Sequence, residues 1–394
     1  MTTTPHFRKT CLTAALAFLA AGCALGHTPE AGAADTIYDL AGERFTVETV
    51  AGGFRVPWAL AWTPEGRLLV TERPGRLSVV EPGAKEARPL ADVPDVDHAG
   101  EHGLMGIALS PAFKDDRLLY VSYTARTAAE GKLQNIIARF RLADDKLTDR
   151  KILIDGLPAA DYHDGLPLRF GKDGKLYAST GDATQRTLAP RMDSLAGKFL
   201  RMNPDGTVPA DNPFPGSLIW SLGHRNCQGF DWDPASGLVW ATEHGPSFPL
   251  DGPGGHDEVN VVEKGKNYGW PQVIGSATAP GCTPPALHSG SGTWAPGGGC
   301  FYTGEKFPAW KGAFFFAGLR GEALYMTRPS AGDPRRAEPL VPVLHRQFGR
   351  LRAVAQGPDG FLYVTTSNRD TRGKPAPDDD RVLRLVPASG GAVK

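Results

Sequence analysis

Hydrophobic and polar residues alternate along this chain as short apolar runs separated by turns that contain Pro, Asp and Gly. The run–turn–run pattern recurs at residues 61–70, 107–122, 168–180, 230–242 and 354–366, with a degenerate copy at 310–326. Each copy is typical of a β-hairpin, in which a tight turn joins two strands. Past the N-terminal segment, no stretch repeats its apolar positions with a sustained helical period. The pattern therefore predicts an all-β protein.

The spacing of the copies selects among all-β folds. Six copies follow one another roughly 45 to 75 residues apart, which is the pitch of propeller blades with loop insertions. A β-sandwich does not predict the recurrence of one hairpin, and a parallel β-helix repeats at a much shorter pitch. We therefore expect a six-bladed β-propeller over residues 36–394, with an N-terminal strand closing the last blade beside Val382 to Val386. Loops from different blades would then converge at the mouths of a central channel.

The N-terminal 35 residues indicate export. Two basic residues precede an apolar segment at residues 11–21, which is long enough for a signal-peptide core and too short to span a bilayer. The segment Leu19–Cys23 resembles a lipoprotein cleavage site, in which Cys23 is lipidated, although Ala20 stands where Leu is usual. A periplasmic or secreted protein and an outer-membrane-anchored lipoprotein both remain open. We assign residues 1–35 to the signal and a spacer.

The net charge limits the classes of partner, and the cysteines bear on whether a disulfide forms. The chain of 394 residues has 43 basic and 43 acidic side chains, so no electrostatic argument favours nucleic acid or an anionic membrane as partner. Cys282 and Cys300 flank a loop rich in Gly, Pro and Ser. In an oxidising compartment we expect a disulfide between them, which would stabilise the fold by ~3 kcal/mol. Cys227 is expected to be a packed thiol.

Polar side chains stand at the edges of the predicted strands, where residues of a channel mouth must lie. The candidates are Glu101, His163, Arg225, Asn226, Gly245, Pro246, Glu258, Arg320, Arg350 and Arg352. Several arginines at such positions indicate a polyanionic ligand, because the guanidinium fork pairs with carboxylates. Taken singly, Arg350 and Arg352 are also compatible with a surface strand, His163 with a structural histidine, and Gly245–Pro246 with a turn.

The same residues resemble a known family. The motifs that carry the resemblance are Glu101–Leu104, His163–Gly165, Gly223–Gly229, Asp257–Asn260, Asn267–Pro271 and Phe301–Gly304. They closely resemble the soluble quinoprotein aldose sugar dehydrogenases of the glucose/sorbosone dehydrogenase family, over residues from about 45 to 386. This resemblance implies a six-bladed propeller, the cofactor pyrroloquinoline quinone (PQQ), calcium, an aldose sugar as substrate and an external electron acceptor.

The resemblance also implies roles for individual residues. His163 matches the general base that takes the proton of the anomeric hydroxyl while hydride moves to the quinone. Arg225 and Asn226 match residues that contact the quinone oxygens. The carboxylates of the cofactor would pair with Arg320, Arg350 and Arg352, and Glu101 would also border the cofactor.

Calcium would be bound at two sets of positions if the resemblance holds. Main-chain oxygens of Gly245 and Pro246 match the ligands of the ion that polarises the cofactor, since hard cations prefer oxygen. Glu258 and Tyr268 match the positions that hold a second, structural ion.

Three departures from the family pattern leave other functions open. Glu101 replaces a usual Gln, residues 164–167 replace a usual Gly-Gly-Arg run, and the loop at 282–300 differs and is expected to border the site. A propeller binding module without catalysis is one alternative. A calcium-dependent propeller lactonase is the other, although it would leave the arginines unexplained.

Overall fold

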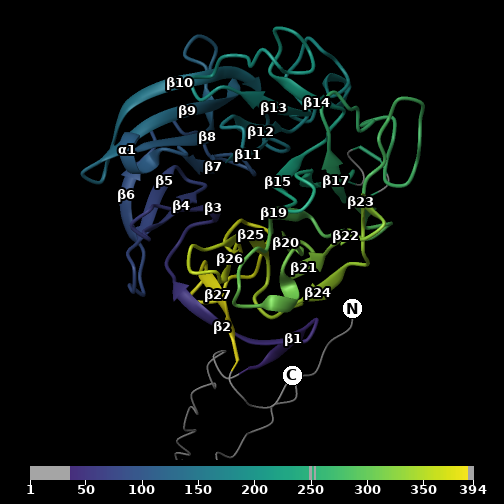
Figure 1. Cartoon of the computed structure of the whole chain (residues 1–394). Helices are drawn as coiled ribbons and strands as arrows, with labels where there is room; N and C mark the ends of the chain where they lie inside the picture. Colours follow the sequence, from purple (N-terminus) through teal and green to yellow (C-terminus); the bar gives the residue numbers. More distant parts are fainter. Residues whose placement is uncertain (1–35, 248–250, 253, 389–394) are drawn as a thin grey trace, which may run out of the picture. The chain divides into compact units, whose positions relative to one another are not determined.

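A computed structural model describes residues 36–247, 251–252 and 254–388 (Figure 1). The predicted signal and spacer, with Cys23, lie outside the described residues. In the described part, no helix has the length and apolarity needed to cross a membrane.

Six antiparallel sheets form the blades, and in each sheet the strands pair in order from the first strand outward. Blade 1 contains β3 (Pro57–Trp62), β4 (Leu68–Glu72), β5 (Arg76–Val80) and β6 (Arg88–Asp92). Blade 2 contains β7 (Leu104–Leu109), β8 (Leu118–Arg126), β9 (Leu133–Ala143) and β10 (Lys146–Pro158), with α1 (Phe113–Asp116) after β7. Blade 3 contains β11 (Gly165–Phe170), β12 (Leu176–Thr180), β13 (Lys198–Met202) and β14 (Ile219–Leu222), with a 3₁₀ turn at Arg186–Leu188.

Blades 4 to 6 follow the same order. Blade 4 contains β15 (Cys227–Trp232), β16 (Val239–Glu243), β17 (Glu258–Val262) and β18 (Leu287–His288). Blade 5 contains β19 (Pro296–Phe301), β20 (Phe314–Gly318), β21 (Ala323–Thr327) and β24 (Val341–Val343), with a 3₁₀ turn at Pro308–Trp310 and a side hairpin of β22 (Pro329–Ser330) and β23 (Asp333–Ala337). Blade 6 contains β25 (Leu351–Gln356), β26 (Leu362–Thr366), β27 (Val382–Pro387), β2 (Glu43–Ala51) and β1 (Tyr38–Leu40).

These sheets confirm the predicted six-bladed propeller. The first strands of the blades contact one another in order, and β25 contacts β3, so the ring is closed (Figure 1). The predicted closure by an N-terminal strand is also confirmed, because β2 pairs with β27 and places Thr46 opposite Val386. The ends of the propeller chain are thus joined by backbone hydrogen bonds.

The five predicted hairpins are the first two strands of blades 1, 2, 3, 4 and 6. Two of these hairpins have the same hydrogen bond at the turn. Asp173 accepts a hydrogen bond from the Tyr177 hydroxyl (2.9 Å), and Asp359 accepts one from the Tyr363 hydroxyl (2.7 Å). In both turns the Gly after the Asp has a positive φ, which a residue with a side chain rarely adopts.

The sixth, degenerate copy is also a hairpin, but it consists of β20 and β21, which are the second and third strands of blade 5. Residues 310–326 reach from the turn before β20 into β21, whereas the first strand of blade 5 is β19, with the sequence Pro-Gly-Gly-Gly-Cys-Phe. A Cβ atom on Gly297 would lie 2.1 Å from the carbonyl oxygen of Arg352, and one on Gly229 would lie 2.4 Å from the nitrogen of Gly299. The neighbouring first strands approach too closely for side chains, so glycines hide the apolar pattern of a strand.

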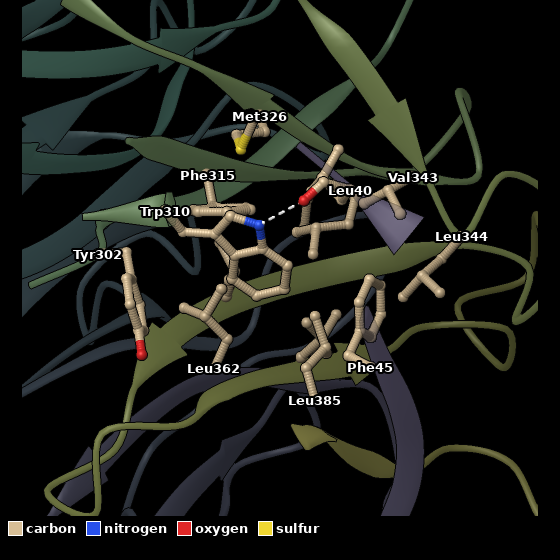
Figure 2. Packing of buried hydrophobic residues seen from close by; sticks show 14 of the residues in the cluster. Leu40, Phe45, Tyr302, Trp310, Phe315, Met326, Val343, Leu344, Leu362 and Leu385 are labelled. Carbon is tan, nitrogen blue, oxygen red and sulfur yellow. Dashed lines mark hydrogen bonds between the residues drawn. The ribbon is translucent and has the colours of Figure 1, made fainter. Parts of the chain in front are cut away.

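Buried aromatic residues join the last two blades to the closing strand (Figure 2). Trp310 is fully buried, and its ring centroid lies 5.4 Å from that of Phe45 on β2 and 5.3 Å from that of Phe315 on β20. Its indole nitrogen donates a hydrogen bond of 2.9 Å to the carbonyl oxygen of Leu40. Trp310 therefore connects blade 5 to both N-terminal strands of blade 6.

The predicted disulfide is absent from the described residues, in which Cys282 and Cys300 are both free thiols. Cys300 lies on β19 and packs into the core shown in Figure 2. The Cys282 sulfur lies instead against the loop at Gly269, 3.2 Å from the position of a Cβ atom there. The loop is held by hydrogen bonds at its far end, where Asp257 accepts from the backbone nitrogens of Trp294 and Ala295.

Candidate functional site

The first strands of neighbouring blades contact one another, and His163, Arg225, Asn226 and Arg350 lie just before the starts of β11, β15 and β25. A Cβ atom on Gly165, at the start of β11, would lie 3.2 Å from the carbonyl oxygen of Cys227, at the start of β15. A Cβ atom on Gly106 of β7 would lie 2.4 Å from the carbonyl oxygen of Leu166 of β11. The residues that precede β7, β11, β15 and β25 therefore gather at one end of the channel, which we call the mouth.

His163 is held in one orientation at the mouth. Its Nδ1 atom lies 2.8 Å from Oδ1 of Asp182, and its Nε2 atom lies 3.0 Å from a terminal nitrogen of Arg225. A guanidinium can only donate, so Nε2 is the acceptor and Nδ1 carries the hydrogen that is donated to Asp182. The backbone at His163 has a φ of 65°, a conformation that is uncommon for residues other than glycine.

Asp182 is buried and fully used as an acceptor. Its Oδ1 also accepts from the backbone nitrogen of Thr184 (2.9 Å), and its Oδ2 accepts from the indole nitrogen of Trp270 (2.8 Å). The backbone nitrogen of Asp182 donates to the carbonyl oxygen of Arg225 (2.7 Å). Asp182 thus connects the histidine to Trp270 through its carboxylate and to Arg225 through its backbone nitrogen.

Arg225 and Asn226 are buried beside His163. Arg225 donates to Asp251 through Nε (2.9 Å) and a terminal nitrogen (2.8 Å), and the guanidinium lies 5.5 Å from the centre of the Trp270 ring. The backbone nitrogen of Arg225 donates to the buried carboxylate of Glu243, which fixes the main chain at this point. In the described part of the chain, the Nδ2 atom of Asn226 has no hydrogen-bond partner.

The remaining arginines reach the mouth from blades 5 and 6. Arg352 is buried, lies 5.7 Å from the centre of the Trp58 ring and donates to Gln228 (3.2 Å), and its Nε has no partner among the described residues. Arg350 donates to Asp370 through two nitrogens (2.8 Å each) and to the carbonyl oxygen of Leu319 (3.2 Å). Arg320, the residue after Leu319, has an exposed side chain.

Glu101, which replaces the usual Gln, adds a negative charge, and this charge is paired with an arginine. Arg372 lies 2.8 Å from the Glu101 carboxylate, with its guanidinium 5.6 Å from the centre of the Tyr162 ring. Arg372 belongs to the segment between β26 and β27 of blade 6. This segment therefore reaches the residues that precede β7 and β11.

The four predicted metal positions share one small cavity. Gly245, Pro246, Glu258 and Tyr268 line a space of about 10 Å³ together with Arg225. Desolvation and the neighbouring Glu243 carboxylate raise the pKa of Glu258 to about 8. Two close carboxylates beside main-chain oxygens form a donor set that suits a hard divalent cation.

A much larger cavity lies in the channel. About 640 Å³ of the channel is lined by residues of all six first strands and includes the turns at their far ends. Gln228 and Trp58 line this space, and both contact Arg352. Arg352 therefore lies at the junction between the channel and the mouth. None of the predicted site residues, which all lie in the described part of the chain, lines this larger cavity.

Sequence reasoning missed several partners of the predicted residues. These are Asp182, Asp251, Trp270 in its role as a donor, Asp370 and Arg372. Asp182 and Asp370 follow β12 and β26, the second strands of their blades. In an antiparallel hairpin the second strand returns to the end where the first strand begins. A search of the residues that follow each second strand would have found these two carboxylates.

The fold and the site define a propeller whose mouth collects arginines, a histidine–carboxylate pair and main-chain oxygens. Residues 54–374 match the family described as Glucose / Sorbosone dehydrogenase, and the chain belongs to this family of oxidoreductases. It is 34% identical over 342 residues to the aldose sugar dehydrogenase YliI of Escherichia coli, covering 81% of this chain and 89% of that protein. The family resemblance found in the sequence is thus confirmed.

Two further proteins are similar to this chain. The PQQ-bound structure of aldose sugar dehydrogenase from Streptomyces coelicolor is 35% identical, with a TM-score of 0.77, and the match covers 87% of this chain and 98% of that one. Quinoprotein glucose dehydrogenase B of Acinetobacter calcoaceticus is 34% identical over 264 residues, which cover 59% of this chain and 54% of that protein.

Proposed function

We propose that this chain is a PQQ- and calcium-dependent aldose sugar dehydrogenase that oxidises the anomeric hydroxyl of its substrate to a lactone. The observation that carries the proposal is the geometry of His163, which is oriented by Asp182 and presents its Nε2 acceptor beside Arg225. Relatives named aldose sugar dehydrogenase, one of them with PQQ bound, support the same assignment.

The residues at the mouth fit a planar quinone with carboxylates. Two buried donors, Asn226 Nδ2 and Arg352 Nε, have no partner among the described residues, and buried donors are costly unless they bind something. Arg320 is exposed, and neither it nor Arg352 has a described carboxylate at ion-pair distance. These groups would hold the oxygens and carboxylates of the cofactor, with Arg350 as a further contact that is already paired with Asp370.

His163 would act as the general base. When bound, the quinone accepts the hydride that leaves the anomeric carbon of the sugar. In the structure the Nε2 lone pair of His163 accepts a hydrogen bond from Arg225, so the Arg225 guanidinium would first turn toward the bound quinone. The freed Nε2 then takes the proton of the anomeric hydroxyl, and the Nδ1 hydrogen stays on the side of Asp182. The carboxylate then stabilises the imidazolium, while Asp251 balances the charge of Arg225 beside it.

Calcium would be held by the residues around the small cavity. Gly245 and Pro246 offer main-chain oxygens, and Glu258 offers a carboxylate. A cation there would stabilise the paired carboxylates of Glu258 and Glu243 and would lie beside Arg225.

Reconstitution tests the proposal. Adding PQQ and Ca²⁺ to purified apoprotein is expected to give aldose-dependent reduction of an electron-accepting dye. The His163→Ala variant is expected to bind the quinone like the wild type and to turn over at least ~100-fold more slowly, the scale of a lost general base. No turnover by the wild type with a broad panel of aldoses would contradict the proposal.

We further propose that the chain is exported and passes its electrons to an external acceptor, on the basis of the signal-like N-terminus. Fractionation of cells that express the full-length chain is expected to place it outside the cytoplasm. If Cys23 is lipidated, the Cys23→Ser variant will be released from the membrane fraction. A full-length chain that stays in the cytoplasm would refute export.

A further inference from the structure

Arg73 lies at the mouth, although nothing in its sequence context marks it as a site residue. It follows β4 directly, donates its backbone N–H to the carbonyl oxygen of Val56 (3.1 Å), and accepts at its own carbonyl from Leu104 N–H (2.9 Å). Val56 and Leu104 adjoin the starts of β3 and β7. A Cβ atom on Gly103 would lie 2.7 Å from the Arg73 Cγ atom. The side chain of Arg73 therefore runs along the segment that carries Glu101.

The carboxylates around Arg73 are already bound by other groups. The groups that interact with it electrostatically are Asp370, Glu101, Arg372, Asp380 and Arg352. Asp370 binds Arg350, and Glu101 binds Arg372. Asp380 accepts from the backbone nitrogens of Val56 (3.2 Å) and Asn368 (2.6 Å). Among the described residues, none forms an ion pair or a hydrogen bond with the Arg73 guanidinium.

Arg73 and the buried cation Arg352 both lie at β3, because the Arg73 backbone nitrogen bonds to Val56 and the Arg352 guanidinium lies 5.7 Å from the centre of the Trp58 ring. A partly buried cation without a partner, beside a like charge, is unfavourable in the free protein. Burial lowers the pKa of Arg73, in agreement with this cost. Such a pair of guanidinium groups is stabilised when an anion binds between or beside them.

We propose that Arg73 binds a carboxylate of the ligand in the mouth, next to Arg352. This inference rests on the proposed function and adds to it a cation from blade 1. The carboxylate belongs either to the quinone or to an acidic sugar substrate, and the two arms of the experiment separate these sources.

The test compares full-length apoproteins with Arg73→Gln, Arg73→Lys and the matched control Arg88→Gln. Arg88 lies on β6 of the same blade, is exposed, and pairs with Glu81 and Asp145. PQQ is titrated in the presence of Ca²⁺ with absorbance detection, and the melting temperature of each apoprotein is recorded. We expect Arg73→Gln to raise the PQQ Kd about 10- to 100-fold, Arg73→Lys to raise it less, and Arg88→Gln to leave it unchanged. The apoprotein melting temperature should not fall in Arg73→Gln, because a desolvated unpaired charge is removed.

A second arm identifies the source of the carboxylate. If the PQQ Kd of Arg73→Gln equals that of the wild type, but its kcat/KM for glucuronate relative to glucose falls at least tenfold, the carboxylate belongs to the substrate and the inference stands. Unchanged values in both arms, or a melting temperature that falls in step with the loss of binding, overturn the role of Arg73 and leave the proposed function intact. A wild type that binds no PQQ overturns both.

Discussion

Asp182→Asn is the substitution that tests the histidine geometry most sharply. In the wild type, three donors share the two oxygens of this buried carboxylate: His163 Nδ1, the Thr184 backbone nitrogen and Trp270 Nε1. An asparagine offers one oxygen and one NH₂ group. If its oxygen faces His163, the NH₂ group meets the indole N–H of Trp270. If it is reversed, the imidazole must move its hydrogen to Nε2, where it meets a donor of Arg225 at 3.0 Å.

The expected losses of stability and of kcat in Asp182→Asn follow from these two conflicts. An unsatisfied buried donor costs about 1–3 kcal/mol, so the melting temperature should fall by several degrees. The reversed orientation also removes the Nε2 acceptor, and with it the general base, which is worth about 10²–10⁴ in rate. The carboxylate that stabilises the imidazolium is lost as well. We expect kcat of Asp182→Asn to fall by about 10³ with little change in the Kd for PQQ.

The assay is steady-state dye reduction at saturating PQQ and Ca²⁺, together with a PQQ titration. Trp270→Phe removes the opposing indole donor and keeps an aromatic ring beside Arg225. The double variant should therefore recover at least tenfold of the activity that Asp182→Asn loses. The reasoning is refuted if kcat of Asp182→Asn stays within threefold of the wild type, or if the double variant is no faster than the single one.

Three further outcomes are expected. Burial raises the pKa of Asp164 to about 7, so its protonated form stabilises the fold fully below about pH 4, and this contribution is lost as the pH rises through about 7. The free energy of unfolding from chemical denaturation should fall by roughly 2–3 kcal/mol between pH 5 and 8 in the wild type but not in Asp164→Asn, and parallel curves would contradict this. Glu101→Gln frees Arg372 and should tighten PQQ binding severalfold in titrations, with less than about 1 kcal/mol change in the free energy of unfolding, since Arg372 is exposed and Glu101 is only partly buried. Chelation of Ca²⁺ should lower the melting temperature and abolish dye reduction, with recovery on adding Ca²⁺ but not Mg²⁺; activity that survives a chelator would argue against the ion.

The blade repeat was predictable because each hairpin can be recognised from its own short stretch of sequence. In the five regular copies, each turn places at least two of the residue types Pro, Asp and Gly between short apolar strands, and in the turns of β11–β12 and β25–β26 the same Asp–Tyr hydrogen bond recurs. Blade 5 escaped the pattern because its first strand uses glycines where neighbouring backbones approach closely. A sequence pattern records side-chain burial, and it fails where close backbone contact replaces side-chain packing.

The sequence predicted the central residues of the candidate site but not the residues that bind to them. His163, Arg225 and Arg350 precede first strands, where a propeller mouth must lie. Their partners come from other blades or distant loops, as Asp370 does for Arg350, so no local spacing reveals them. The disulfide expected between Cys282 and Cys300 is also absent from the described residues. The two cysteines are close in the sequence, but Cys300 lies on the first strand β19 and packs into the core, away from Cys282.

The central claim is that the mouth binds one quinone through the unpartnered donors around Arg352. Titration of the full-length apoprotein with PQQ in the presence of Ca²⁺, for the wild type and for Arg352→Gln, tests it most directly. The account predicts saturable one-to-one binding by the wild type and binding at least tenfold weaker in Arg352→Gln. No saturable binding, or equal affinities of the two proteins, would contradict it.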